Sequence, residues 1–141
     1  MKILLAACNA KYIHSNLAVF NLKAYAKEYD SQVVLREYTI NQLKDDILKD
    51  IYRCHPDVVC VSCYIWNITF VRELMQDLRK ILPDVPFWAG GPEVSYDAET
   101  FLGKNPAFNG VMVGEGEETF LELVKHYVDG SVTLEETRGL V

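Results

Sequence analysis

Short apolar runs alternate along this chain with segments in which apolar residues recur every three or four positions. The apolar runs predict strands at residues 2–8, 32–37, 57–62, 86–89 and 110–113. The three- to four-residue periodicity predicts amphipathic helices at residues 17–28, 41–52, 69–82 and 117–128, with a further short helix around Phe101. Asn41 is the expected N-cap of the second helix, and Gly130 the expected stop of the last. This alternation predicts an α/β fold, a doubly wound five-stranded parallel sheet of order 2-1-3-4-5, Rossmann-like or flavodoxin-like.

The length and composition fit one globular domain. The 141 residues suffice for a single core, and we assign residues 1–130 to it. Residues 131–141 add no complete element and are expected to begin a linker to another domain. The net charge of −6, without a run of Lys or Arg, argues against nucleic acid as a partner, and the chain shows no membrane-spanning stretch. The apolar start, residues 1–8, is as long as one strand rather than a signal peptide, so a cytoplasmic protein is expected.

The four cysteines are predicted to be structural and reduced. Cys60 and Cys63 have the spacing of half a zinc site, but the run of residues 57–63 is typical of a buried strand, where residues three apart point to opposite faces. Cys8 and Cys54 give no further metal pattern.

Loops that follow the strands should meet at the carboxyl edge of the sheet, where open α/β sheets bind ligands. The loops in question are residues 9–16, 62–67, 90–95 and 114–117. Glycines in the last two would let the backbone approach a ligand closely. Tyr12, Tyr64 and Trp66 either cover a flat, partly apolar ligand or cap the sheet edge, and composition leaves both explanations open.

The ordered set formed by His14, Ser62, Gly90-Gly91 and Gly114-Glu115-Gly116-Glu117 resembles the cobalamin-binding domain that precedes the catalytic domain of many radical S-adenosylmethionine enzymes. The resemblance implies that a corrin lies across the sheet edge and that its nucleotide tail passes the small residues Ser62, Gly90 and Gly91. On that basis Gly91→Leu should block the tail and leave the fold largely intact. The cofactor-binding residues predicted in this way are Asn9, Tyr12, His14, Ser15, Ser62, Tyr64, Trp66, Gly90, Gly91, Pro92, Glu93, Gly114, Glu115 and Gly116.

The chain also departs from the wider family pattern D-x-H-x-x-G, S-x-L, G-G. Tyr12 stands at the Asp position and Leu17 at the first Gly position, while Tyr64 replaces the Leu. His14 is the only candidate cobalt ligand, and without the carboxylate that would orient its imidazole, we expect weak ligation or none and assign no metal ligand. Glu115 and Glu117 fit helix capping and ligand contact equally well.

By resemblance, the full-length protein would be a cobalamin-dependent radical S-adenosylmethionine enzyme, a methyltransferase or a related radical enzyme. A barrel after Val141 would carry S-adenosylmethionine and a [4Fe-4S] cluster and be the domain's partner in cis. The chain holds no C-x-x-x-C-x-x-C run for such a cluster, so this domain alone should not catalyse.

Three alternatives come from other classes. A degenerate domain could serve docking or substrate recognition without the cofactor. A receiver domain would need acids where Asn9 and Ser62 stand, and a flavin-binding module would need a better phosphate loop than residues 9–12.

Overall fold

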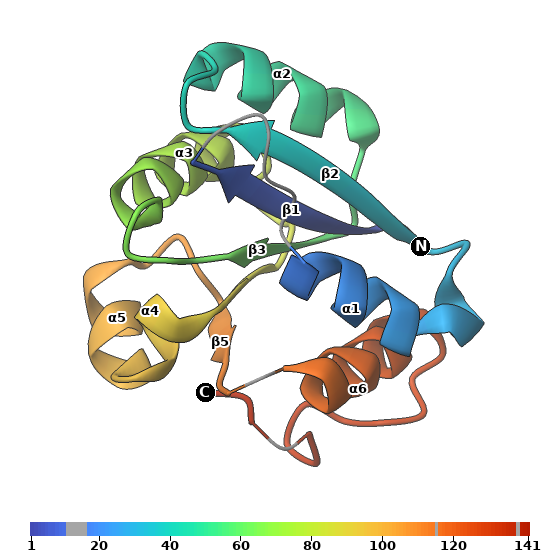
Figure 1. The fold of residues 1–141 in the computed structure, drawn as a ribbon. Coiled ribbons are helices and arrows are strands. Elements are labelled where there is room, and N and C mark those ends of the chain that lie inside the picture. Colours follow the sequence, from blue (N-terminus) through green and yellow to red (C-terminus); the bar gives the residue numbers. More distant parts are fainter. Residues whose placement is uncertain (11–16, 115, 138) are drawn as a thin grey trace.

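The computed structural model describes residues 1–10, 17–114, 116–137 and 139–141. Within these residues, five parallel strands form one sheet of order β2-β1-β3-β4-β5, which confirms the predicted fold (Figure 1). The strands are β1 (Ile3–Asn9), β2 (Val33–Thr39), β3 (Val58–Ser62), β4 (Phe87–Gly90) and β5 (Gly110–Met112). The apolar residues at the start of the chain form β1, which pairs with both β2 and β3.

The helices also follow the predicted order. They are α1 (Leu17–Tyr25), the 3₁₀ turn η1 (Lys27–Tyr29), α2 (Lys44–Cys54), α3 (Ile68–Ile81), α4 (Pro92–Ser95), α5 (Ala98–Lys104) and α6 (Glu117–Val128). The prediction of Asn41 as an N-cap was wrong, because α2 begins at Lys44 with Leu43 in the cap position. The short helix α4 was not expected. None of the described helices is long and apolar enough to cross a membrane.

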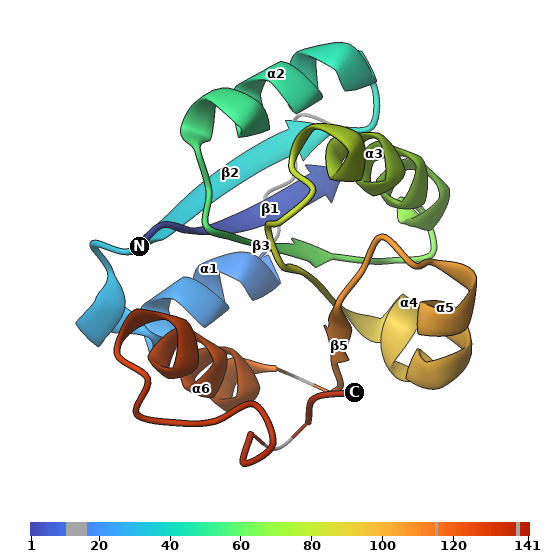
Figure 2. The same ribbon diagram turned by 180° about the vertical axis from the view of Figure 1, so that it is seen from behind.

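The helices cover the sheet in two layers, and each layer has its own core (Figures 1 and 2). Apolar residues of α2, α3, α4 and α5 pack on one face of the sheet, and those of α6 pack on the other, where α1 also lies. Alternate strand residues supply the two cores, as the period of a strand requires. Cys60 belongs to the α6 side and Cys63 to the opposite side, so this pair of thiols is divided between the faces.

The end of the chain folds back along β5. The N–H of Val113 donates to the Gly139 carbonyl at 2.7 Å, and Val111 and Val141 exchange two backbone hydrogen bonds of 3.1 and 3.0 Å. Leu140 forms an isolated antiparallel bridge with Met112 and packs on the α6-side core. Residues 139–141 therefore cover the free edge of β5 (Figure 2).

Candidate binding site at the carboxyl edge of the sheet

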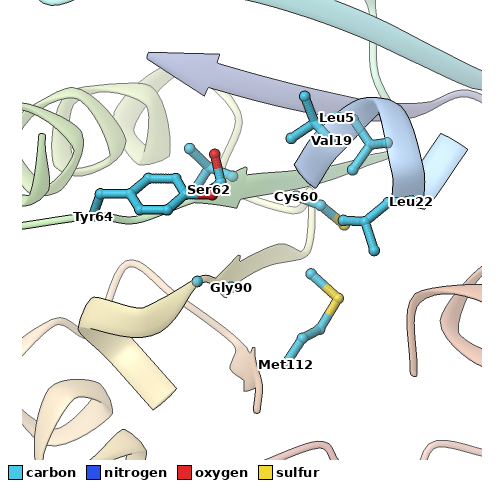
Figure 3. Close-up of a pocket in the computed structure, with 10 residues that line it drawn as sticks. Leu5, Val19, Leu22, Cys60, Ser62, Tyr64, Gly90 and Met112 are labelled. Carbon is cyan, nitrogen blue, oxygen red and sulfur yellow. The ribbon is translucent and has the colours of Figure 1, made fainter. Parts of the chain in front are cut away.

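The strand register brings the predicted small residues together at the carboxyl edge. Ser62 at the end of β3 lies beside Gly90 at the end of β4, and Gly90 lies beside Met112 of β5. Ser62, Tyr64, Gly90 and Gly91 all line one cavity (Figure 3). Four residues predicted from two different loops thus border a common space.

The cavity runs from this edge down between the sheet and α1. Its inner wall is apolar and comes from β1, β3, α1 and β5, with Leu5, Cys60, Val61, Val19, Leu22 and Met112. The volume of about 40 Å³ would hold a few water molecules. Figure 3 shows Leu22 and Met112 on opposite sides of this space, near Cys60. Flexible side chains therefore set how wide the cavity is.

The two adjacent glycines have different roles. Gly90 has strand geometry, and a Cβ there would face the cavity, 3.4 Å from the terminal methyl carbon of Met112. Gly91 has a φ of +107°, and a Cβ there would lie 2.4 Å from the Cys63 carbonyl oxygen. The backbone itself thus requires glycine at position 91. This geometry argues against the expectation that Gly91→Leu would leave the fold largely intact, and it makes Gly90 the cleaner position for filling the cavity.

The turn after β3 is held by Asn67, a residue that the sequence analysis did not select. Its buried side chain accepts a 2.7 Å hydrogen bond from the Tyr64 N–H and donates to the carbonyls of Cys8 and Ser62 at 3.0 and 3.2 Å. The amide thereby ties the ends of β1 and β3 to the turn that carries Tyr64. Asn67 occupies the N-cap position of α3, but its side chain makes no capping bond.

Aromatic rings extend the site outward from the cavity. The rings of Tyr64 and Trp66 are stacked, with centroids 5.2 Å apart and planes 3° from parallel. Trp66 remains 42% exposed, and the neighbouring Ile65 is 80% exposed. The cavity mouth is therefore flanked by a flat, partly apolar surface.

A second unpredicted residue, Ser95, joins the two glycine motifs. Its hydroxyl donates to the Gly91 carbonyl at 2.8 Å and accepts from the Gly114 N–H at 3.3 Å. Gly114 and Gly116 both have a φ of +84°, a conformation that favours glycine. The motifs after β4 and β5 are thus connected through one side chain of α4.

Other predicted residues lie further from the cavity or cannot be placed. Asn9 is at the edge, but its side chain donates to Glu37 of β2 at 3.3 Å. Pro92 and Glu93 are exposed at the start of α4. Tyr12, His14, Ser15 and Glu115 lie outside the described residues.

Cys60 in the cavity wall, and the buried Cys8 and Cys63 outside it, carry protonated thiols at neutral pH. Burial raises the pKa of Cys60 to about 12, and it raises the pKa of Cys8 to about 12 as well. Burial also raises the pKa of Cys63, with smaller contributions from Cys8 and Glu93. These thiols stay protonated and act as small apolar residues, whereas metal binding requires the thiolate.

An open α/β domain with an apolar cavity at the carboxyl edge of its parallel sheet is a ligand-binding domain in its architecture. Residues 3–124 match the B12 binding domain family, and the chain belongs to that family. The resemblance inferred from the glycine motifs is thereby confirmed.

Related proteins include methyltransferases of Streptomyces. The cobalamin-dependent radical SAM methyltransferase TokK of Streptomyces tokunonensis is 31% identical over 111 residues, which are 73% of this chain and 15% of that protein. Cytidylyl-2-hydroxyethylphosphonate methyltransferase of Streptomyces wedmorensis is 32% identical over 97 residues, 68% of this chain and 18% of that protein. This chain therefore spans less than a fifth of the length of these two relatives.

Solved structures show the same fold at lower identity. The cobalamin-dependent S-adenosylmethionine radical enzyme OxsB, with aqua-cobalamin and S-adenosylmethionine bound, superposes with a TM-score of 0.79 at 18% identity. The match covers 99% of this chain and 20% of that chain. A cobalamin-binding protein of Desulfitobacterium hafniense gives a TM-score of 0.58 at 14% identity over 90% of this chain.

Proposed function

We propose that this domain binds cobalamin at the carboxyl edge of its sheet and serves a cobalamin-dependent radical S-adenosylmethionine enzyme, a methyltransferase like its named relatives or a related radical enzyme. The observation that carries the proposal is the apolar cavity that begins between Ser62 and Gly90 and continues under α1. It lies at the edge where the family resemblance implies that the tail of the cofactor enters the sheet.

The residues present fit the chemistry of this cofactor. The stacked rings of Tyr64 and Trp66 offer a flat surface to the flat, partly apolar corrin. At Gly90 the missing side chain leaves room beside the flexible tip of Met112, so a tail could enter without displacing backbone. Because the cavity volume is only about 40 Å³, binding requires Met112 and Leu22 to move aside.

The chain's own residues would bind and orient the cofactor, and the cofactor would supply the methyl-carrying cobalt. The apolar wall around Cys60 would exclude water from the buried tail. We further propose that S-adenosylmethionine and a [4Fe-4S] cluster belong to a following radical domain, and that residues 131–141 lead towards it. We also propose a cytoplasmic location, where the four free, buried cysteines would stay reduced.

One observation favours the second candidate, a cofactor-free docking or substrate-recognition domain. The narrow cavity is already lined by packed side chains, and Tyr12 replaces the family's aspartate. A direct binding measurement separates the two functions.

The purified domain is mixed with hydroxocobalamin, desalted, and examined by visible absorption. We expect the parent to retain cobalamin and Gly90→Leu, which fills the cavity, to bind about tenfold more weakly or worse. Gly103→Leu is the matched control, because Gly103 has no neighbouring atom within 4 Å of an added Cβ. Circular dichroism checks that both variants fold. A parent that retains no cobalamin would contradict the proposal and favour the docking function.

A further inference from the structure

We infer that residues 139–141, here named the strap, position the binding edge of the domain by holding the end of β5. The inference rests on the proposed function where it concerns cobalamin affinity, but its structural part stands without the cofactor.

The strap is connected to both glycine motifs by a short series of hydrogen bonds. The Gly139 carbonyl accepts from the Val113 N–H at 2.7 Å. The next amide, that of Gly114, donates to Ser95, and the Ser95 hydroxyl donates to the Gly91 carbonyl. A shift of the strap would therefore move the backbone that carries Gly114 and release the link to Gly91.

The strap also touches the first turn of α6. Gly139 has a φ of +82°, and a Cβ there would lie 2.5 Å from the Thr119 hydroxyl oxygen and 3.3 Å from the Val113 carbonyl oxygen. Val113 precedes Gly114, and Thr119 follows Gly116 on α6. The strap thus packs against the chain on both sides of this glycine pair, and only glycine fits at the contact.

A third contact reaches the cavity itself. Leu140 bridges to Met112, and both residues belong to the α6-side core. Met112 lines the cavity and must move to admit a ligand tail. The strap therefore packs behind the side of the cavity that Met112 forms.

These contacts assign Gly139 and Leu140 as positioning residues that act through Val113, Gly114 and Met112. In the full-length enzyme proposed above, the strap would also connect this edge to the domain that follows.

The test compares the same substitution at two glycines that both have a positive φ, a conformation that is strained for other residues. Gly139→Val places a side chain against Thr119, whereas Gly130→Val adds one at a φ of +70° with no atom within 4 Å. Amide hydrogen exchange is measured on the cofactor-free chain. We expect Gly139→Val to speed exchange at Val113 and Gly114 by about tenfold. Exchange at Val59, which is bonded to Pro86 at the centre of the sheet, should stay unchanged in both variants.

Hydroxocobalamin titration of the same variants gives the functional readout. We expect about tenfold weaker binding in Gly139→Val and parental binding in Gly130→Val. Ser95→Ala is the second variant, because it removes the hydroxyl that connects Gly114 to Gly91. It should speed amide exchange at Gly114 but not at Val113.

The possible failures are distinguishable. A parent that does not bind cobalamin would contradict the proposed function, while the exchange data would still report on the strap. The inference is overturned if Gly139→Val leaves exchange at Gly114 unchanged, or if it loosens Gly114 and cobalamin binds as tightly as in the parent. Faster exchange at Val59 as well would show general destabilisation and would also overturn it.

Discussion

The carbonyl oxygen of Cys63 lies where a side chain at Gly91 would begin, only 2.4 Å from the position of a Cβ. The Cys63 N–H also donates to the Gly90 carbonyl at 2.7 Å, so the backbones of the two turns are in direct contact. The turn after β4 therefore packs directly against the turn after β3, and this contact fixes the backbone at the carboxyl edge of the sheet.

We predict that Gly91→Ala lowers the free energy of unfolding by about 2–4 kcal/mol, because it combines a positive φ with a backbone clash. Urea denaturation measures the change. Gly103→Ala, in the open on α5, should be neutral or stabilising by up to about 1 kcal/mol. Parental stability in Gly91→Ala would show that the turn adjusts freely.

Arg79 at the end of α3 should be a main contributor to stability away from the binding edge. Its guanidinium lies 3.8 Å from the centre of the Phe87 ring and donates to the carbonyls of Leu82, Pro83, Val85 and Ala107. We predict that Arg79→Met costs about 2–4 kcal/mol, because several carbonyls lose their partner, and that Arg79→Lys recovers only part of it.

Thermal or urea unfolding of the Arg79 variants tests this expectation. Lys80→Met is the control, since among the described residues Lys80 makes only an exposed ion pair with Asp77 and should change stability by less than about 0.5 kcal/mol. Equal losses in Arg79→Met and Lys80→Met would refute the assignment.

Stability should fall in alkaline solution because of the buried thiols. The pKa of Cys60 is raised by burial from 9.0 to about 12, so the folded state holds the proton more tightly than the unfolded state. The stability that the protonated Cys60 thiol gives the folded state is fully present below pH 9. It is lost between pH 9 and 12, and the free energy of unfolding then falls by about 1.4 kcal/mol per pH unit.

Urea denaturation under reducing conditions between pH 8 and 10 checks the sign. Cys60→Ala should flatten the pH dependence, although it is less stable at pH 8. Val61→Ala removes a neighbouring apolar group that does not titrate and should keep the parental slope. A parental slope in Cys60→Ala would contradict the expected linkage.

The cobalt ligand remains a prediction from sequence, because His14 and Tyr12 lie outside the described residues. A phenol with a pKa of about 10 is neutral at pH 7 and gives the imidazole little of the basicity that a carboxylate would give. We therefore expect that His14→Ala leaves the cob(II)alamin electron paramagnetic resonance spectrum unchanged. Nitrogen splitting that is present in the parent and absent in His14→Ala would identify His14 as the lower ligand.

The sequence predicted features that depend on local periodicity. Residues 117–128 were predicted as a helix with the bounds that α6 has, because its apolar face repeats regularly and Gly130 ends it. The strand order followed from alternating elements and right-handed connections. The beginning of α2 was misplaced because Asn41 has a capping side chain but precedes the helix by three residues.

The connections within the site could not be read from local patterns. Asn67 and Ser95 act through hydrogen bonds to residues that are distant in sequence, such as Cys8 and Gly114. Gly90 and Gly91 are the same residue type in the sequence. Only the fold shows that a side chain at position 90 would face the cavity and that one at position 91 would meet the Cys63 carbonyl. The pairing of Gly139 with Val113 likewise depends on where the chain returns.

The return of the chain along β5 also bears on self-association. An uncovered edge strand presents a row of unpaired amides and carbonyls to which another molecule can add a strand. Here Val111 and Val113 form those hydrogen bonds with Val141 and Gly139 of the same molecule. A variant that released this segment would expose a short, apolar edge beside Met112, and it should aggregate at concentrations at which the parent stays monodisperse.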